Sequence, residues 1–355
     1  MWDLAVREDD YTKADSLLRR KFAPDKLPMV HRAVMAIVHR DSAARARLHE
    51  EIRRQTSGSL FAPKLIALYL NDFPAAEEFA RAALASPRPR AARVQVQQVL
   101  AELELAQGKW RAAKAAFALA ERSLPSAKRM RALSATWPFL AIPDSELVAL
   151  RAELETWNPQ AEAPEATPGL ASTLQPQLRL YLLGLLSSRL EDQAQALRHA
   201  AELEESDHPA EAAALVRDLA RTIRAEVEWR RGRAAEALEL LEPVRGEVPS
   251  ELLVDPFFAE EGARYLRAEL LYQLGRDREA LQWFSNGFQG TPNEVAYLAP
   301  THLRQAELHE RLGDRQQAVD HYSRFIQLWS GCDPELRPSV ARAKERVASL
   351  LGEPR

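Results

Sequence analysis

The sequence predicts an all-α protein built from repeated pairs of antiparallel helices, and two observations carry this prediction. Alanine and leucine, both strong helix formers, supply nearly a third of the 355 residues, whereas glycine supplies only 13. A short pattern of glycine, alanine and an aromatic residue or leucine also recurs along the chain. Recurrence at a period of about 20 to 50 residues is typical of helical arrays.

The recurring pattern places alanine five residues after glycine and a larger residue four residues later. It occurs at Gly108, Ala113 and Phe117; at Gly232, Ala237 and Leu241; at Gly275, Ala280 and Phe284; at Gly313, Ala318 and Tyr322; and, with Glu191 in place of glycine, at Ala196 and Ala200. Glycine is expected to end the first helix in a left-handed conformation, which lets the chain reverse. The alanine is expected where the paired helices cross closely, with the next residue one turn further along the buried face.

In chain order, the pattern defines a series of helix pairs. Clear pairs are predicted at 94–127, 177–210, 218–251, 261–294 and 299–332, a weaker pair at 57–91, and degenerate pairs at 27–56 and 127–157. The weaker pair keeps Asn71 in the turn, with Ala76 and Ala83 at the small positions. In the last degenerate pair, Asp144 or Ser145 is expected to cap a helix.

Two segments differ from the pairs. Prolines exclude a continuous helix over 158–176, which is predicted to be a linker or an exposed loop. It divides an N-terminal sub-array at 1–157 from a C-terminal sub-array at 177–332. Residues 333–355 are predicted to form a capping helix and tail, with Val340, Val347 and Leu350 on one stripe.

The N-terminal end is expected to enter the array partway through a pair. Asp10 to Leu18 has the pattern of a second helix, with only about nine residues before it. Either a short helix caps the array here, or the chain is cut from a longer protein. Apolar surface left exposed at this end would favour self-association.

The repeat resembles the tetratricopeptide repeat, whose pattern has a small residue in the first helix and alanine, an aromatic residue and proline in the second. Leu183-Gly184 carries the first-helix signature. The resemblance implies a right-handed superhelical solenoid whose first helices line a concave groove for a protein or peptide. In that family, peptides are bound by fixed positions of the first helix.

Carried over to this sequence, those positions give a candidate partner-binding groove. It consists of the acidic residues Glu102, Glu226, Glu269 and Glu307 and the aromatic residues Tyr181, Trp229, Tyr265 and Tyr272. One interpretation is an acidic rail for a basic or amphipathic partner. The other is that helix-forming glutamates occupy exposed positions while the aromatic side chains fill gaps between repeats.

The sequence gives weaker support to a kinase, a metal site or a cysteine nucleophile. His39-Arg40-Asp41, Asp72-Phe73-Pro74 and Ala163-Pro164-Glu165 mimic kinase motifs but lack the required asparagine, glycine and phosphate loop. His302, His309 and His321 share one repeat, yet no carboxylate or thiol joins them at ligand spacing, so packing is favoured over a metal site. Cys332 is interpreted as an exposed thiol without an assignable catalytic partner. No cofactor is expected.

Charge and hydropathy restrict the partners. The formal net charge is -3, and arginine-rich pieces alternate with acidic residues, which argues against nucleic acid. The longest apolar stretch, Leu180 to Leu186, is too short to insert into a membrane, and residues 1–13 lack the apolar core of a secretory signal. A cytoplasmic location is expected.

The C-terminal part also resembles the tetratricopeptide region of bacterial serine/threonine protein kinases and related regulators. The resemblance rests on Leu308 to Trp329, Asp333 to Leu336 and Val340 to Ala343, and it includes no kinase domain. The first functional prediction is a non-enzymatic interaction scaffold. The alternative is a sensory or regulatory fragment that binds a peptide or small molecule.

Overall fold

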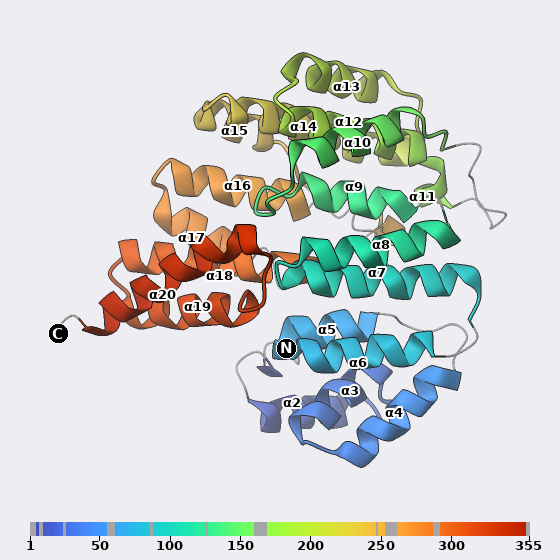
Figure 1. The fold of residues 1–355 in the computed structure, drawn as a ribbon, viewed down its shortest axis with the longest axis vertical. Coiled ribbons are helices and arrows are strands. Elements are labelled where there is room, and N and C mark those ends of the chain that lie inside the picture. The colour runs from blue at the N-terminus through green and yellow to red at the C-terminus, as the bar shows by residue number, and fades with distance from the viewer. Residues whose placement is uncertain are drawn as a thin grey trace. The chain divides into compact units, whose positions relative to one another are not determined.

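The computed structural model describes residues 5–6, 10–23, 26–54, 61–85, 88–124, 127–159, 169–245, 248–252, 261–286 and 292–352. Every regular element within these ranges is a helix, and most are arranged as packed consecutive pairs (Figure 1). The all-α, helical-repeat prediction is therefore confirmed. Residues 163–165, one of the kinase-like triplets, lie outside the described ranges.

The helix pairs follow the predicted order. They are α3 (Met29–Val38) with α4 (Ser42–Arg54), α5 (Phe61–Leu70) with α6 (Phe73–Leu84), α7 (Arg90–Ala106) with α8 (Trp110–Ser123), α9 (Lys128–Thr136) with α10 (Asp144–Glu155), α12 (Gln175–Arg189) with α13 (Gln193–Glu205), α14 (Ala213–Arg230) with α15 (Ala234–Leu241), α16 (Glu261–Gln273) with α17 (Asp277–Asn286), and α18 (Leu298–Arg311) with α19 (Arg315–Leu328). Short elements lie between them: α11 (Leu170–Thr173) and the 3₁₀ helices η3 (Ala210–Ala212), η4 (Ser250–Leu252), η5 (Pro292–Tyr297) and η6 (Pro334–Leu336).

Most of the turns inside the pairs contain one residue in the left-handed conformation. The φ angle is 70° at Gly108, 76° at Gly232, 70° at Gly275 and 81° at Gly313, and it is 52° at Asn71 and 61° at Glu191, the two predicted substitutes for glycine. Arg40, with φ 53°, has the same role between α3 and α4, although its sequence gave no turn signal. The predicted register of the turns is thus confirmed.

The same turns share a hydrogen-bond pattern. The Gly232 N–H donates to the Trp229 carbonyl at 2.9 Å, and the Arg233 N–H donates to the Glu228 carbonyl at 2.9 Å. Equivalent pairs of bonds occur at Arg40, Gly108, Glu191, Gly275 and Gly313. This is the Schellman arrangement, in which a left-handed residue satisfies the last carbonyls of a helix.

Aspartates after several of these turns cap the second helix. The carboxylates of Asp41, Asp72, Asp192 and Asp314 each accept a bond from the backbone N–H three residues later. Asp144, predicted as a cap, is instead the first residue of α10, and Pro143 holds the cap position without a side-chain bond. Asp144 still lies in the first turn, where a negative charge favours the helix dipole.

The small residues lie where helices approach closely. Ala113, Ala196, Ala237, Ala280 and Ala318 are fully buried, as are Phe117 and Phe284, and Tyr322 is nearly so. In α12, a Cβ atom added to Gly184 would lie 2.5 Å from Cδ1 of Ile223 on α14. Glycine at this position is therefore required by helix packing and not by backbone conformation.

The chain forms two compact units, which differ from the predicted sub-arrays. Unit 1 contains 1–127 with 294–298, and unit 2 contains 128–293 with 299–355. The predicted boundary at 158–176 is displaced because α9 and α10 pack on α12. The described part of that segment is also partly helical, since α11 lies within it and α12 begins at Gln175.

The two ends of the chain carry further helices. In unit 1, α2 (Tyr11–Lys21) begins at the cap Asp10 and buries Ala14 and Leu18, as the second-helix pattern predicts. In unit 2, α20 (Arg337–Gly352) packs on α19 and buries Val340 and Leu350. A helix therefore occupies 337–352 of the segment predicted as a capping helix and tail, and Val347 on its stripe is partly buried.

Substitutions in the turns should have effects of opposite sign. A Cβ atom at Gly275 meets no atom within 4 Å, so Gly275→Ala causes no steric overlap with other residues. The left-handed conformation alone should lower the free energy of unfolding by about 1–2 kcal/mol. Glu191→Gly should stabilise by about 0.5 kcal/mol, because Glu191 already holds the left-handed conformation. Urea unfolding monitored by circular dichroism measures both. Gly352→Ala, equally open but without positive φ, is the control, and equal losses in Gly275→Ala and Gly352→Ala would contradict the argument.

The close approach of α12 and α14 gives a second prediction. Gly184→Ala should destabilise by about 1–3 kcal/mol, because the new methyl group overlaps Ile223. Ile223→Val removes Cδ1, the nearest atom, so the double variant should lose less than the sum of the two single losses. The measurement is a double-mutant cycle in urea, and simple additivity would show that the overlap is not the cause.

Candidate functional site

The candidate site of unit 2 lies on the first helices of three consecutive pairs, α14, α16 and α18. We call it the tyrosine–arginine surface, and it consists of Trp229, Tyr272, Arg304, Glu307 and Arg311. Ion pairs and ring contacts join α16 to α18, and a hydrogen bond joins α14 to α16. Its members come from three repeats, because equivalent faces of successive first helices lie side by side.

Tyr272 lies at the centre of this surface. The guanidinium carbons of Arg304 and Arg311 lie 4.5 Å and 4.0 Å from its ring centroid. Partial burial raises the pKa of the Tyr272 hydroxyl, and the neighbouring Glu307 carboxylate raises it further, so the phenol stays neutral at pH 7. The ring is therefore held in place by two cations and remains partly exposed.

Arg304 links the acidic residues around Tyr272. Its Nε lies 2.7 Å from Oε1 of Glu269, and its Nη1 lies 2.7 Å from Oε2 of Glu307. Burial disfavours the charged guanidinium, but Glu269 and then Glu307 outweigh this effect and raise the pKa of Arg304. The side chain of Glu269 is only 4% exposed, whereas that of Glu307 is 27% exposed.

Trp229 and Glu226 extend the site onto α14. The indole Nε1 of Trp229 donates to Oε1 of Gln273 at 3.0 Å, and the Arg230 guanidinium lies 5.6 Å from its ring. Oε2 of Glu226 lies 3.6 Å from Nε of Arg230. Burial raises the pKa of Glu226, and the nearby Arg230 and Arg189 oppose that rise.

The remaining predicted groove residues lie in the interior. Tyr181 is 5% exposed and Tyr265 is 4% exposed. Glu102, in unit 1, is 5% exposed, and its carboxylate pairs with Nζ of Lys64 at 2.6 Å. Burial raises the pKa of Glu102, and Lys64 acts against the increase.

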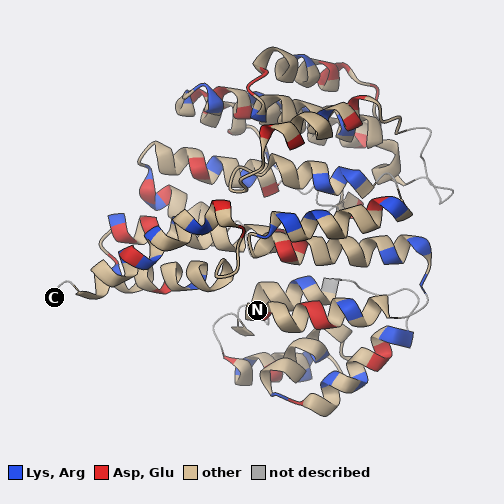
Figure 2. Cartoon of the chain, in the orientation of Figure 1, with Lys and Arg blue, Asp and Glu red and all other residues tan. Residues whose placement is uncertain are grey.

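These contacts correct the picture of an open acidic rail and also the picture of freely exposed glutamates. Each of Glu102, Glu226, Glu269 and Glu307 has a lysine or arginine nitrogen within 3.6 Å. Figure 2 shows the same intermixing of basic and acidic residues along the helices. The role of the groove residues in binding stays a prediction, but it no longer rests on unpaired negative charge.

The sequence reasoning missed the cations that complete the site. Spacings of three and four residues place Glu307 beside Arg304 and Glu226 beside Arg230 on one helical face, so this signal was present. Glu269 and Arg304 are 35 residues apart, close to one repeat, which places them on neighbouring first helices. Two residues of opposite charge about one repeat apart therefore also indicate an ion pair between neighbouring first helices.

The residues considered for other chemistry have structural surroundings. Asp41 and Asp72 of the kinase-like triplets accept backbone bonds at the starts of α4 and α6. Cys332 was interpreted as exposed, but it is 4% exposed, and burial raises the pKa of its thiol. Within the described ranges, no group of three or more His, Cys, Asp or Glu residues is arranged to hold a metal ion.

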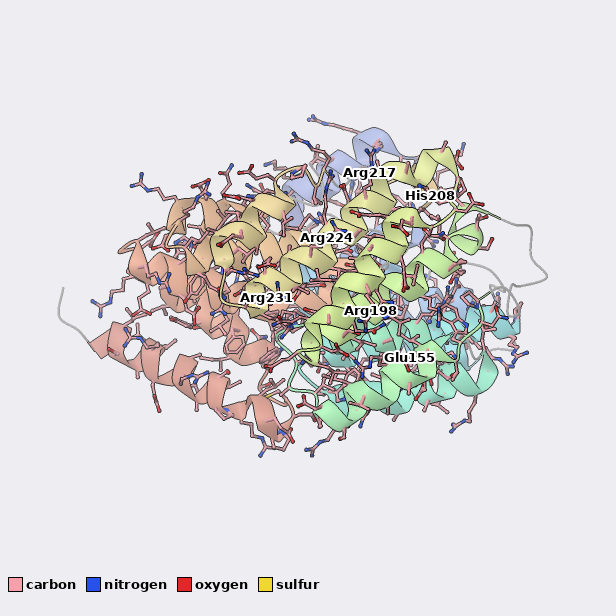
Figure 3. The ribbon with its side chains drawn as sticks, turned by 90° about the horizontal axis from the view of Figure 1, so that it is seen from above. Glu155, Arg198, His208, Arg217, Arg224 and Arg231 are labelled. Atoms are coloured by element: carbon pink, nitrogen blue, oxygen red, sulfur yellow. The ribbon has the colours of Figure 1, made fainter. Side chains whose placement is uncertain are left out.

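The outer face of unit 2 carries a row of arginines. Figure 3 shows Arg217, Arg224 and Arg231 following one another along α14 and its C-terminal end. Arg224 pairs with Glu204 at 2.7 Å and Arg231 with Glu228 at 3.0 Å, whereas the Nε of Arg217 donates to the Ala213 carbonyl of its own helix. Arg217 is thus a suitable surface control for substitutions at the candidate site.

The left-handed turns, close-packed alanines and paired helices define an all-α helical-repeat protein. Among solved structures, the chain is similar to a tetratricopeptide repeat protein from Parabacteroides merdae ATCC 43184. It is 18% identical, with 86% of this chain and 99% of that chain covered at a TM-score of 0.40. No protein-family model matches the chain, and no curated protein matches it.

None of the helices in the described part of the chain combines the length and the apolar character needed to cross a bilayer.

A cluster of three histidines from α18 and α19 predicts that the folded protein is less stable in acid. Nδ1 of His302 lies 3.0 Å from Nδ1 of His321, and the ring of His309 stacks on that of His321. Burial lowers the pKa of His302 to about 3 and that of His321 to about 4, and each is lowered further by a neighbouring histidine and Arg324. Both imidazoles are therefore neutral at pH 7.

The unfolded chain binds protons at these histidines below about pH 6.5, whereas the folded chain does not until about pH 4. The contribution of these histidines to the free energy of unfolding should be fully present above about pH 6.5 and decrease as the pH falls toward 4. At pH 5, His302 alone should lower that free energy by about 2 kcal/mol. Urea unfolding at pH 7.5 and 5.0 checks this. His302→Asn should reduce the difference between the two pH values, whereas exposed His39→Asn should not; an unchanged difference in His302→Asn would refute the assignment.

Proposed function

We propose that the protein is a non-enzymatic interaction scaffold and that a segment of a partner protein binds its tyrosine–arginine surface. The observation that carries this proposal is the Tyr272 ring held between Arg304 and Arg311 while still partly exposed. Tyrosine, tryptophan and arginine contribute most to protein interfaces, and fixed side chains lose little entropy on binding. The tetratricopeptide-like fold supports this role.

The electrostatics favour an amphipathic partner over a purely basic one. Glu269 and Glu307 are both engaged by Arg304, so a basic partner would have to compete with an internal cation. Arg311 has a side chain that is 42% exposed, although it also contacts Asp277. A partner segment with an apolar side chain for Tyr272 or Trp229 and an acidic side chain for Arg311 would match this surface.

The proposal is tested by comparative capture. The immobilised full chain is exposed to lysate of the source cell, and proteins are quantified by mass spectrometry for the wild type and for Trp229→Ala, Tyr272→Ala and Arg217→Ala. At least one protein should be depleted about ten-fold or more in the first two variants and retained by Arg217→Ala. Its affinity is then measured by calorimetry with purified components.

Two outcomes would contradict the proposal. If every captured protein is retained by both site variants, the tyrosine–arginine surface is not the binding site. If the purified chain hydrolyses nucleotides in a standard screen, the non-enzymatic assignment fails. Circular dichroism of each variant separates loss of binding from loss of folding.

The regulatory alternative rests on the resemblance of Leu308 to Ala343 to kinase-associated repeats. It makes a different prediction about the gene. A reading frame that continues upstream of Met1 into a kinase or DNA-binding domain supports it, whereas an upstream stop codon supports the standalone scaffold.

A further inference from the structure

The connection between α9 and α10 differs from an ordinary loop. We call residues 137–142, Trp-Pro-Phe-Leu-Ala-Ile, the internal segment. Trp137, Leu140 and Ile142 are only 5%, 2% and 8% exposed. Loops are usually polar and exposed, and here Pro138 and Pro143 oppose continuation of either helix. The internal segment is therefore an apolar stretch of irregular backbone packed into unit 2.

Arg189, the last residue of α12, anchors the base of this segment. Its Nη1 donates to the Trp137 carbonyl, and its Nη2 donates to the Leu140 carbonyl at 2.5 Å. The Leu140 N–H also donates to the Trp137 carbonyl at 3.3 Å and closes a turn. Burial and then Arg230 lower the pKa of Arg189 to about 10, so the guanidinium stays charged at pH 7. A side chain thus binds the segment's backbone as it would bind a peptide.

Phe139, at the tip of the turn, reaches a first helix far away in sequence. Its ring lies 5.4 Å from the ring of Tyr265 on α16 in an edge-to-face arrangement, and Tyr265 makes a similar contact with Phe284 at 5.8 Å. Unlike Trp137 and Leu140, Phe139 is partly exposed. The tip therefore covers one end of α16 with an aromatic side chain.

The covered end belongs to the same face of α16 as the tyrosine–arginine surface. Tyr265 and Tyr272 are seven residues apart, hence two turns along one helical face, about 10 Å apart in rise. Tyr265 was one of the predicted groove residues, and it is buried next to the chain's own Phe139. One face of α16 therefore has an occupied aromatic position and a partly exposed one.

We infer that Tyr265 is a docking position for an aromatic residue of a partner segment and that Phe139 occupies it as a built-in competitor. This inference rests on the proposed function, because it assigns the chemistry of the same partner. The partner segment carries an aromatic side chain within a short apolar stretch, as the internal segment does. It replaces the Phe139 ring on Tyr265.

The energetics restrict the exchange to the tip. Trp137, Leu140 and Ile142 are buried, and Arg189 binds both carbonyls, so the base of the segment stays in place. The Phe139 ring stacks on Trp137 at 5.8 Å and makes an edge-to-face pair with Tyr265. The exchange replaces the edge-to-face pair, a contact that changes an equilibrium constant by roughly two- to ten-fold. Removing the Phe139 ring should therefore tighten partner binding by about five-fold.

The test uses the full chain and a fluorescein-labelled peptide with the sequence of residues 135–143. Fluorescence anisotropy should show that Phe139→Ala binds the peptide about five-fold more tightly than the wild type. The same peptide with alanine in place of its phenylalanine should lose this gain. In the Phe139→Ala background, Tyr265→Phe should retain binding because the ring remains, whereas Tyr265→Leu should weaken it by roughly two- to ten-fold.

The matched control is Val148→Ala, which removes an exposed apolar side chain from α10. It should bind the peptide as the wild type does. If Phe139→Ala is not folded by circular dichroism, Phe139→Leu retains the apolar volume without the ring and is expected to show the same direction of change. Equal affinity of the wild type and the folded Phe139 variant, or undiminished binding after Tyr265→Leu, overturns the inference.

These outcomes are separate from those of the capture experiment. Capture that depends on Trp229 and Tyr272, together with a negative peptide result, retains the scaffold function and removes only the competitor. A positive peptide result without such capture retains Tyr265 as a docking position and removes the tyrosine–arginine surface.

Discussion

The left-handed residue inside the helix pairs is the constraint on which much of the structure depends. At positive φ the chain reverses within a few residues, and the two Schellman bonds satisfy the carbonyls that end the first helix. The second helix then starts at a fixed offset, so an alanine five residues later is buried in every pair whose turn residue is glycine, Asn71 or Glu191; after Arg40 this position is Arg45. A turn of another length would rotate the second helix and expose this alanine. Backbone conformation thus determines which side chains form the core and which first-helix side chains remain for the candidate site.

Arginine side chains connect one helix end to the next element. Arg179 donates to the carbonyls of Leu154 and Glu155 at the end of α10, and Arg267 donates to those of Leu241 and Val244 after α15. Arg189 does the same for the internal segment. Helix ends leave carbonyls without intrahelical partners, and a guanidinium can satisfy two of them at once. These arginines therefore serve the fold itself, and Figure 2 shows basic and acidic residues intermixed along the helices.

The sequence predicted what depends on local backbone and on repetition. Glycine turns, their substitutes Asn71 and Glu191, and the small residues at helix crossings follow from short-range rules and were found in place. Arg40 was missed because an arginine adopts positive φ only when its surroundings enforce it. The pairing of Glu269 with Arg304 depends on a neighbouring repeat. Glu226 and Glu307 instead pair with arginines of their own helices, at spacings that the sequence already contains. The unit boundary was misplaced because prolines in 158–176 indicate a break in helix, not a break in packing.

Helical periodicity places Tyr265 and Tyr272, the central residues of the two proposals, on one face of α16. Repetition places equivalent side chains of successive first helices side by side. An aromatic ring on α16 is therefore contacted by side chains of neighbouring elements or remains exposed to a partner. Arg304 and Arg311 contact Tyr272 with charged groups that leave the ring partly exposed. At Tyr265, which is buried, the neighbouring groups are the apolar rings of Phe139 and Phe284. Because Arg189 fixes the internal segment by its backbone alone, the identity of the tip side chain is free to match the chemistry of a partner without altering the repeats beneath it.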